Sequence, residues 1–113
     1  MHELALAESL ITQLGKIAEQ ERTDKIISVK LLIGTFSGVD TDALEFALPF
    51  AAENTPFENT RFIFQEVKLK LKCSGCGKEA FPAEALILCP LCGSDDVEII
   101  QGREFVIKEI ETP

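Results

Sequence analysis

Two short cysteine pairs constrain the fold of this chain more than any other feature of its sequence. Each pair has two residues between its cysteines, Cys73-Ser-Gly-Cys76 and Cys89-Pro-Leu-Cys92, and a glycine follows each pair. Two intervening residues allow both sulfurs of a pair to face one ion, and four thiolates complete a tetrahedron around Zn²⁺. Such a site leaves no position for water or substrate. The pattern therefore predicts a structural zinc site rather than a catalytic one.

Other uses of the four cysteines fit the sequence less well. Two disulfides would be unusual in a cytosolic chain, and a thioredoxin-like redox pair needs a βαβ setting that neither pair has. Iron, in a cluster or a rubredoxin-like site, remains an alternative because tetrahedral sulfur suits iron as well. For any metal, Gly77 and Gly93 are expected to take positive φ, which turns backbone N–H groups toward the thiolates.

Composition limits the partners of the chain. It has 113 residues, 46% of them apolar, and a formal charge of −8, which suits a globular domain and repels polyphosphate. With Zn(Cys)₄ included, the stretch 68–98 has a net charge of about −3, and Phe81 is its only aromatic residue. Both properties argue against nucleic-acid binding. A zinc ribbon that binds nucleic acid or protein, with no role in metal delivery, nevertheless remains the alternative function. No apolar run spans a bilayer and the start does not resemble a signal peptide, so a cytoplasmic protein is expected.

Hydrophobic periodicity indicates five elements in the rest of the chain. The 3.6-residue period marks helices and the two-residue period marks strands. The expected helices span 4–22 and 40–53, and the expected strands span 26–33, 61–72 and 103–110. Asp40 or Thr41 is the expected cap of the second helix, and Pro49 is expected to kink or interrupt it.

The strand expected at 61–72 changes its apolar parity along its length. Such a change moves side chains to the opposite face, so a bulge or a change of core is predicted near Gln65–Glu66. The cysteine segment then lies between two strands of one sheet. The predicted fold is α+β: two helices on a three-stranded sheet (1–67 and 103–113), with a zinc-ribbon-like domain (68–102) inserted before the last strand.

The amino terminus carries a second candidate metal site. The chain begins Met1-His2-Glu3, and His2 is its only histidine. Methionine aminopeptidases require a small second residue, and His2 is large, so Met1 is expected to be retained. Its amine, the His2 amide nitrogen and the His2 imidazole can chelate one ion, with Glu3 as a further donor, and such nitrogen-rich sets suit Ni²⁺ and Cu²⁺. The alternative is an isolated terminal histidine with no role.

These features resemble those of the HypA/HybF family of hydrogenase-maturation nickel chaperones. The start "MHELALAESL", the stretch "LLIGTFSGVDTDALEFAL" and the spaced cysteine pairs carry the resemblance, which runs from Met1 to about Glu111. It implies a nickel-binding α/β domain with a zinc domain inserted before its last strand. It also implies delivery of Ni²⁺ to the large subunit of [NiFe] hydrogenase, in cooperation with a nickel-handling GTPase, and relatives also serve urease maturation.

The resemblance assigns roles to particular residues. Met1, His2 and Glu3 match the nickel motif of the family, and Cys73, Cys76, Cys89 and Cys92 match its zinc ligands. Asp40 matches an acidic position linked to nickel in some members. Some relatives have histidines beside the cysteine pairs, and this chain has none.

No catalytic set is visible in the sequence. The only histidine is terminal and the cysteines are best assigned to zinc, so the chain is predicted not to be an enzyme. The expected oligomeric state is a monomer or a weak homodimer.

Overall fold

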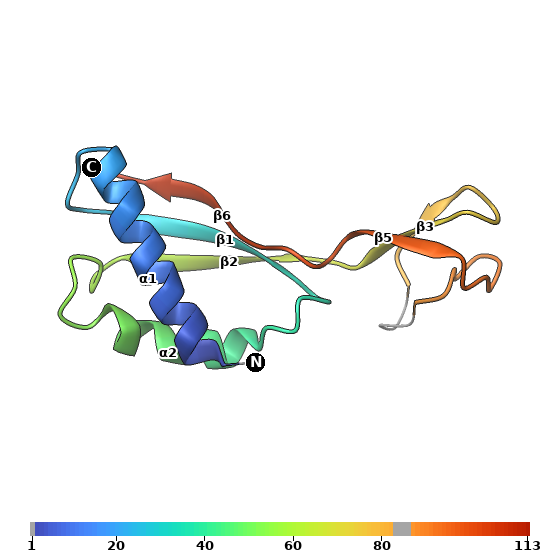
Figure 1. Ribbon diagram of the computed structural model, residues 1–113, viewed down its shortest axis with the longest axis horizontal. Helices are drawn as coiled ribbons and strands as arrows, with labels where there is room; N and C mark the ends of the chain where they lie inside the picture. Colours follow the sequence, from blue (N-terminus) through green and yellow to red (C-terminus); the bar gives the residue numbers. More distant parts are fainter. Residues whose placement is uncertain (1, 83–86) are drawn as a thin grey trace. The chain divides into compact units, whose positions relative to one another are not determined.

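The computed structural model describes residues 2–82 and 87–113. The two helices are α1 (Glu3–Gln20) and α2 (Thr41–Ala52). The strands of the described residues are β1 (Ser28–Gly34), β2 (Arg61–Val67), β3 (Lys70–Cys73), β4 (Glu79–Ala80), β5 (Val97–Gln101) and β6 (Phe105–Glu111). Figure 1 labels all of them except β4. None of the helices in the described residues is both long and apolar enough to cross a membrane.

Contacts between residues divide the chain into two compact units. The first, here called the α/β unit, comprises Met1–Leu31, Val39–Gln65 and Ile107–Pro113. The second, the cysteine unit, comprises Leu32–Gly38 and Glu66–Val106. Each unit is described by itself below.

The larger sheet has the strand order β2-β1-β6. Ile27 donates its N–H to Glu111, whereas Gly34 donates to Glu104, so β1 and β6 are antiparallel. Backbone hydrogen bonds at the two ends of β2 join Arg61 to Ile27 and Val67 to Thr35, so β1 and β2 are parallel. Parallel neighbours require a crossover connection, and α2 provides it.

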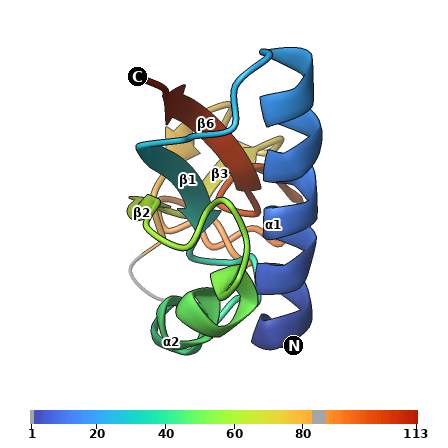
Figure 2. The same ribbon diagram turned by 90° about the vertical axis from the view of Figure 1, so that its left-hand side faces the viewer.

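Both helices lie beside this sheet (Figure 2), and each buries one apolar stripe. The buried positions of α1 recur at helical spacing: Ala7, Leu10, Leu14 and Ala18. Those of α2 are Leu44, Ala47, Leu48 and Ala52. Strand β1 contributes Val29 and Leu31 to the same core. Ile27 lies within the strand expected over 26–33, but β1 begins only at Ser28 and Ile27 is 46% exposed.

The cysteine unit has its own three-stranded sheet, in the order β4-β3-β5. Strand β3 pairs antiparallel with both neighbours: Leu71 lies opposite Ala80 on one side and Ile99 on the other. The register shifts between Lys70 and Leu71, which marks a bulge at the start of β3. Leu71 is 1% exposed and is the central apolar side chain of this unit.

Two glycines allow a close backbone crossing within the cysteine unit. A Cβ on Gly34 would lie 2.0 Å from the carbonyl oxygen of Gly102, and one on Gly102 would lie 2.6 Å from the Cα of Leu69. Gly102 also has φ 115°, which disfavours any other residue. Beside the crossing, the Phe36 N–H donates to the Gly102 carbonyl at 2.8 Å. These two positions therefore require glycine.

Two expectations about the elements need correction. The strand expected over 61–72 is two strands, β2 and β3, separated at Lys68–Leu69. The change of core predicted near Gln65–Glu66 is confirmed, because the α/β unit ends at Gln65 and the cysteine unit begins at Glu66. Pro49 does not interrupt α2, which continues to Ala52. The helix accommodates it because a proline removes only one hydrogen bond, here near the carboxyl end. The short β4 and β5 were not expected at all.

Candidate metal sites

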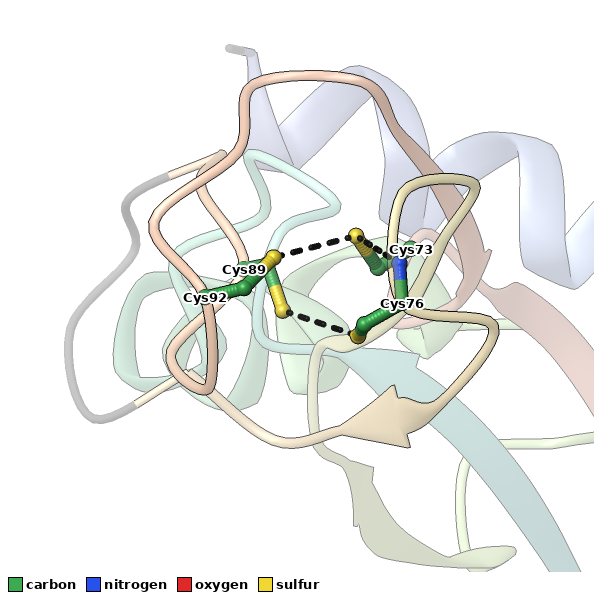
Figure 3. A group of neighbouring side chains, drawn as sticks. All are labelled: Cys73, Cys76, Cys89 and Cys92. Atoms are coloured by element: carbon green, nitrogen blue, oxygen red, sulfur yellow. Dashed lines mark hydrogen bonds between the residues drawn. The ribbon is translucent and has the colours of Figure 1, made fainter.

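The four cysteines converge on one point of the cysteine unit (Figure 3). Their sulfur atoms all lie within 4.8 Å of one another. The Sγ atoms of Cys73 and Cys92 are 3.5 Å apart and those of Cys76 and Cys89 are 3.8 Å apart. A disulfide would need about 2.05 Å. All four are free thiols, so the disulfide alternative does not describe this fold.

The sulfur separations fit a tetrahedral metal. Zinc–thiolate bonds of about 2.3 Å place the corners of a tetrahedron about 3.8 Å apart. The Cys73–Cys92 and Cys76–Cys89 separations lie at or just below that value, and the remaining pairs lie within 4.8 Å. The cluster is therefore compatible with a structural Zn²⁺ site made entirely of sulfur.

The turns after each pair have the conformation expected from the sequence. Gly77 has φ 73° and Gly93 has φ 76°, as predicted. Each glycine donates its N–H to the backbone carbonyl of the first cysteine of its pair, Gly77 to Cys73 at 2.9 Å and Gly93 to Cys89 at 2.8 Å. The Cys76 N–H points at the Cys73 sulfur at 3.4 Å. These bonds orient the sulfurs before any metal binds.

The thiols influence one another strongly. A hydrogen bond from the Cys92 backbone N–H lowers the pKa of Cys89 to about 7. The Ser94 N–H lowers the pKa of Cys92, but the neighbouring thiols of Cys73 and Cys89, together with desolvation, outweigh it and raise that pKa to about 11. The first thiolate accepts hydrogen bonds from its neighbours, whereas the next one meets a like charge. A divalent cation at the centre removes that penalty.

One lysine of the cysteine unit, Lys70, is engaged within the unit. Lys70 forms an ion pair with Glu79 at 3.1 Å, and its ammonium lies 5.4 Å from the centre of the Phe81 ring. The same contacts occupy the aromatic ring that a nucleic-acid base would need for stacking. The nucleic-acid-binding alternative is therefore not favoured by this surface.

The second candidate site lies at the start of α1, in the α/β unit. Met1 falls outside the described residues. His2 is exposed and is the N-cap residue of α1, with extended backbone (φ −88°, ψ 92°) and no hydrogen bond from its side chain to the cap. Its carbonyl accepts the first helical hydrogen bond, from Leu6 at 3.1 Å. The imidazole is therefore available to a ligand.

Glu3 and Asp40, 37 residues apart in sequence, meet at this end of the unit. The Glu3 carboxylate accepts a hydrogen bond from the Asp40 backbone N–H at 3.1 Å. The Asp40 carboxylate in turn accepts one from Ala43 at 3.1 Å and caps α2, as expected. The first turns of both helices thus lie side by side (Figures 1 and 2).

These residues do not form a preassembled side-chain cluster. Among the described residues, only the four cysteines form a group of three or more metal-binding side chains close enough to share an ion. The structure brings Glu3 to Asp40, but the Glu3 carboxylate is occupied by the backbone of α2. The contact itself was not expected. Asp40 or Thr41 was expected to cap α2, but no sequence pattern indicates a contact with Glu3.

Comparison with known proteins relates the chain to one group. A family model described as hydrogenase/urease nickel incorporation, metallochaperone, hypA matches residues 1–112. The hydrogenase maturation factor HypA of Chloroflexus aggregans is 39% identical over 114 residues, covering 100% of both chains. That of Nitrosospira multiformis is 37% identical, covering 98% of this chain and 96% of the relative. The solution structure of the Ni metallochaperone HypA from Helicobacter pylori has a TM-score of 0.72 and 26% identity, covering 98% and 97%.

Proposed function

This chain belongs to the HypA family of nickel metallochaperones for hydrogenase maturation, and we propose that its cargo site is the amino terminus, Met1, His2 and Glu3. The observation that carries the proposal is the position of His2. It is exposed at the N-cap of α1 and directly follows Met1 in the sequence. The cargo is Ni²⁺, bound for transfer rather than for chemistry on the chaperone itself.

The start of a helix suits a chelate that uses backbone nitrogen. The first four N–H groups of an α-helix have no partner within the helix. The first helical hydrogen bond here is donated by Leu6, so the amides of His2 and Glu3 can turn to a metal without breaking the helix. With the Met1 amine and the His2 imidazole, they offer the nitrogen-rich set that Ni²⁺ prefers.

The same location explains how the ion can be released. Both α1 and α2 present the positive ends of their dipoles here, and each disfavours a cation by roughly 0.3–1 kcal/mol. The carboxylates of Glu3 and Asp40 offset this effect. We propose that Asp40 acts by holding Glu3 and by its charge, with direct ligation to nickel as a second possible role. A site balanced in this way binds an ion and gives it up to a stronger acceptor.

The four cysteines serve a different purpose in the proposal. Cys73, Cys76, Cys89 and Cys92 would hold a structural Zn²⁺, and the ion would supply the fixed charge that keeps four thiolates together. The ligands leave no open position on the metal. We propose the domain division expected from the sequence, residues 1–67 with 103–113 for nickel and 68–102 for zinc. The compact units differ from it in that 32–38, 66–67 and 103–106 belong to the cysteine unit.

The proposed partners follow from the family role. We infer that the chain exchanges nickel with a nickel-handling maturation GTPase. It delivers the nickel to the large subunit of [NiFe] hydrogenase, with urease as a second client. It acts as a chaperone rather than an enzyme, as a monomer or weak homodimer. Its place is the cytosol, where four free thiols persist.

The test compares two extended forms of the chain by isothermal titration with Ni²⁺. A Gly-Ser extension before Met1 should abolish one-to-one binding, because it replaces the free amine by an amide. The same extension after Pro113 is the matched control and should bind as the unmodified chain does. His2→Ala should also abolish binding, and zinc content should not change in any variant. Unchanged nickel affinity in the amino-terminally extended form would exclude this site.

A further inference from the structure

We propose that the outer face of α2 docks a partner protein through a segment that is both apolar and positively charged. The inference deepens the proposed function and depends on it, because a chaperone must contact the proteins with which it exchanges its ion. The face, here called the α2 face, consists of Asp42, Glu45, Phe46, Pro49, Phe50 and Glu53. These positions lie at spacings of three and four, so they form one continuous stripe of the helix.

Two large aromatic side chains stand out from the α2 face. Phe46 is 73% exposed and Phe50 is 61% exposed, and the centres of their rings are 5.4 Å apart. Neither ring contributes to the core, which α2 reaches through its opposite side at Leu44 and Leu48. Single exposed apolar residues are common, but a paired aromatic ridge is typical of a contact surface. Aromatic residues of this kind dominate the energy of protein interfaces.

A groove lies beside the aromatic ridge, between α2 and β2. Its apolar walls include Pro49, Phe62 and Phe64, and it has a volume of about 200 Å³. The charged groups that line it, Glu45 and Glu58, are both acidic. The α2 face and the groove share Glu45 and Pro49, so together they form a surface that can hold an apolar side chain between carboxylates.

The charge around the α2 face identifies the occupant. No lysine or arginine occurs between Lys30 and Arg61, and the same stretch contains five carboxylates, Asp40, Asp42, Glu45, Glu53 and Glu58. A basic partner segment is therefore attracted and oriented by this surface. A second copy of the chain is a poor occupant, because the chain has a net charge of −8 and would bring the same acidic rim to the contact.

The experiment uses the full-length chain and replaces the ridge by Phe46→Ser with Phe50→Ser. Binding of the nickel-handling GTPase, measured by titration, should weaken by at least about thirtyfold, as for the loss of an interface hot spot. The matched control is Leu91→Ser with Val106→Ser, two exposed apolar residues of the cysteine unit, which should bind as wild type does. Nickel stoichiometry should be the same in all forms, which shows that the variants remain folded at the cargo site.

A second pair of variants tests the charge. Glu45→Gln with Glu53→Gln should weaken binding of the GTPase about threefold at low salt and hardly at all at high salt, where charges are screened. The control is Glu8→Gln with Glu19→Gln, two exposed carboxylates of α1, and it should have no effect. Binding by the Phe46→Ser/Phe50→Ser form at the wild-type affinity would overturn the inference while leaving the chaperone function intact.

A probe that is independent of the GTPase separates the two proposals. An amphipathic peptide of leucine and lysine should shift the NMR signals of Phe46 and Phe50, and a leucine–glutamate peptide should not. If the wild-type chain does not bind the GTPase, the proposed partner is wrong, and the peptide alone decides the docking surface. Equal shifts with both peptides, or shifts confined to α1, would overturn it. So would a dimer that the Phe46→Ser/Phe50→Ser form abolishes, because the face would then join two copies.

Discussion

The α/β unit buries twelve apolar residues, whereas the cysteine unit buries five, counted over residues 2–82 and 87–113, and two of those five are the cysteines Cys73 and Cys89. The remaining three, Ile33, Leu69 and Leu71, cannot form a substantial core. The first unit is therefore stabilised by apolar burial, whereas the second lacks a core of that size, and a metal ion held by its four thiolates would supply the missing stability. In the proposed function, a metal ion is thus the transferable cargo of one unit and a structural component of the other.

Removal of a zinc ligand should change the folding of the chain most, and it should separate the two units most clearly. Cys73→Ser should unfold the cysteine unit and leave the α/β unit folded, because metal binding in small zinc modules supplies about 10–16 kcal/mol of folding free energy. NMR spectra should lose the dispersed signals of β3 and β5 and retain those of α1. Ser74→Ala is the adjacent control and should keep all signals. Loss of dispersion over the whole chain would show that the two units do not fold separately.

Removal of a core side chain should have the reverse effect. Leu14→Ala, at a fully buried position in α1, should lower the free energy of unfolding of the α/β unit by about 3–5 kcal/mol. Leu4→Ala, on the same helix but exposed, should cost less than about 0.5 kcal/mol. Chemical denaturation measures the difference, with zinc content followed in parallel. Release of zinc by Leu14→Ala before the helices unfold would contradict the independence of the units.

The pH dependence of zinc affinity should follow the two shifted thiols. Protons compete with the metal for each thiolate, so affinity rises with pH. The Cys92 pKa of about 11 makes its proton a competitor throughout the neutral range, whereas Cys89, with a pKa of about 7, adds a further proton only below that pH. Below about pH 7, zinc affinity should therefore fall by an additional factor of about ten for each pH unit, compared with its fall above pH 7. Chelator competition measures it, and a constant slope across pH 7 would contradict the assignment.

The smallest effect is expected where the two helices begin. Asp40→Ala should cost about 1 kcal/mol of stability, the usual value for loss of an N-cap, and should also weaken nickel binding. Asp40→Asn keeps the cap but removes the charge, so it should preserve stability and still weaken nickel binding. Denaturation and nickel titration on both variants separate the two roles. Equal nickel affinity in wild type and Asp40→Asn would remove any role of the Asp40 charge at the cargo site.

Most of the local structure could be predicted from the sequence, for physical reasons. Helix periodicity placed both helices to within two residues at each end, and the spacing of the cysteines indicated a single sulfur cluster. Both signals are local and repeat every few residues. The break between β2 and β3 was missed because the alternation continues on either side of Lys68, and only tertiary hydrogen bonds end the strand there.

Contacts between distant segments were not predictable in the same way. Nothing in the sequence pairs Glu3 with Asp40, because a hydrogen bond from backbone to side chain leaves no periodic signal. The exposure of Phe46 and Phe50 was equally hidden, since aromatic residues on an apolar helix are expected to be buried. The features that bear most on partners are therefore those for which the structure was needed.

The division of the chain into units has a consequence for its breakage. The polypeptide passes from one unit to the other at four points, after Leu31, Gly38, Gln65 and Val106. A single proteolytic cut within residues 66–106 therefore leaves both fragments anchored in the α/β unit by their own strands. A nicked molecule would therefore elute as a single species in native gel filtration, and its two fragments would separate only in denaturant.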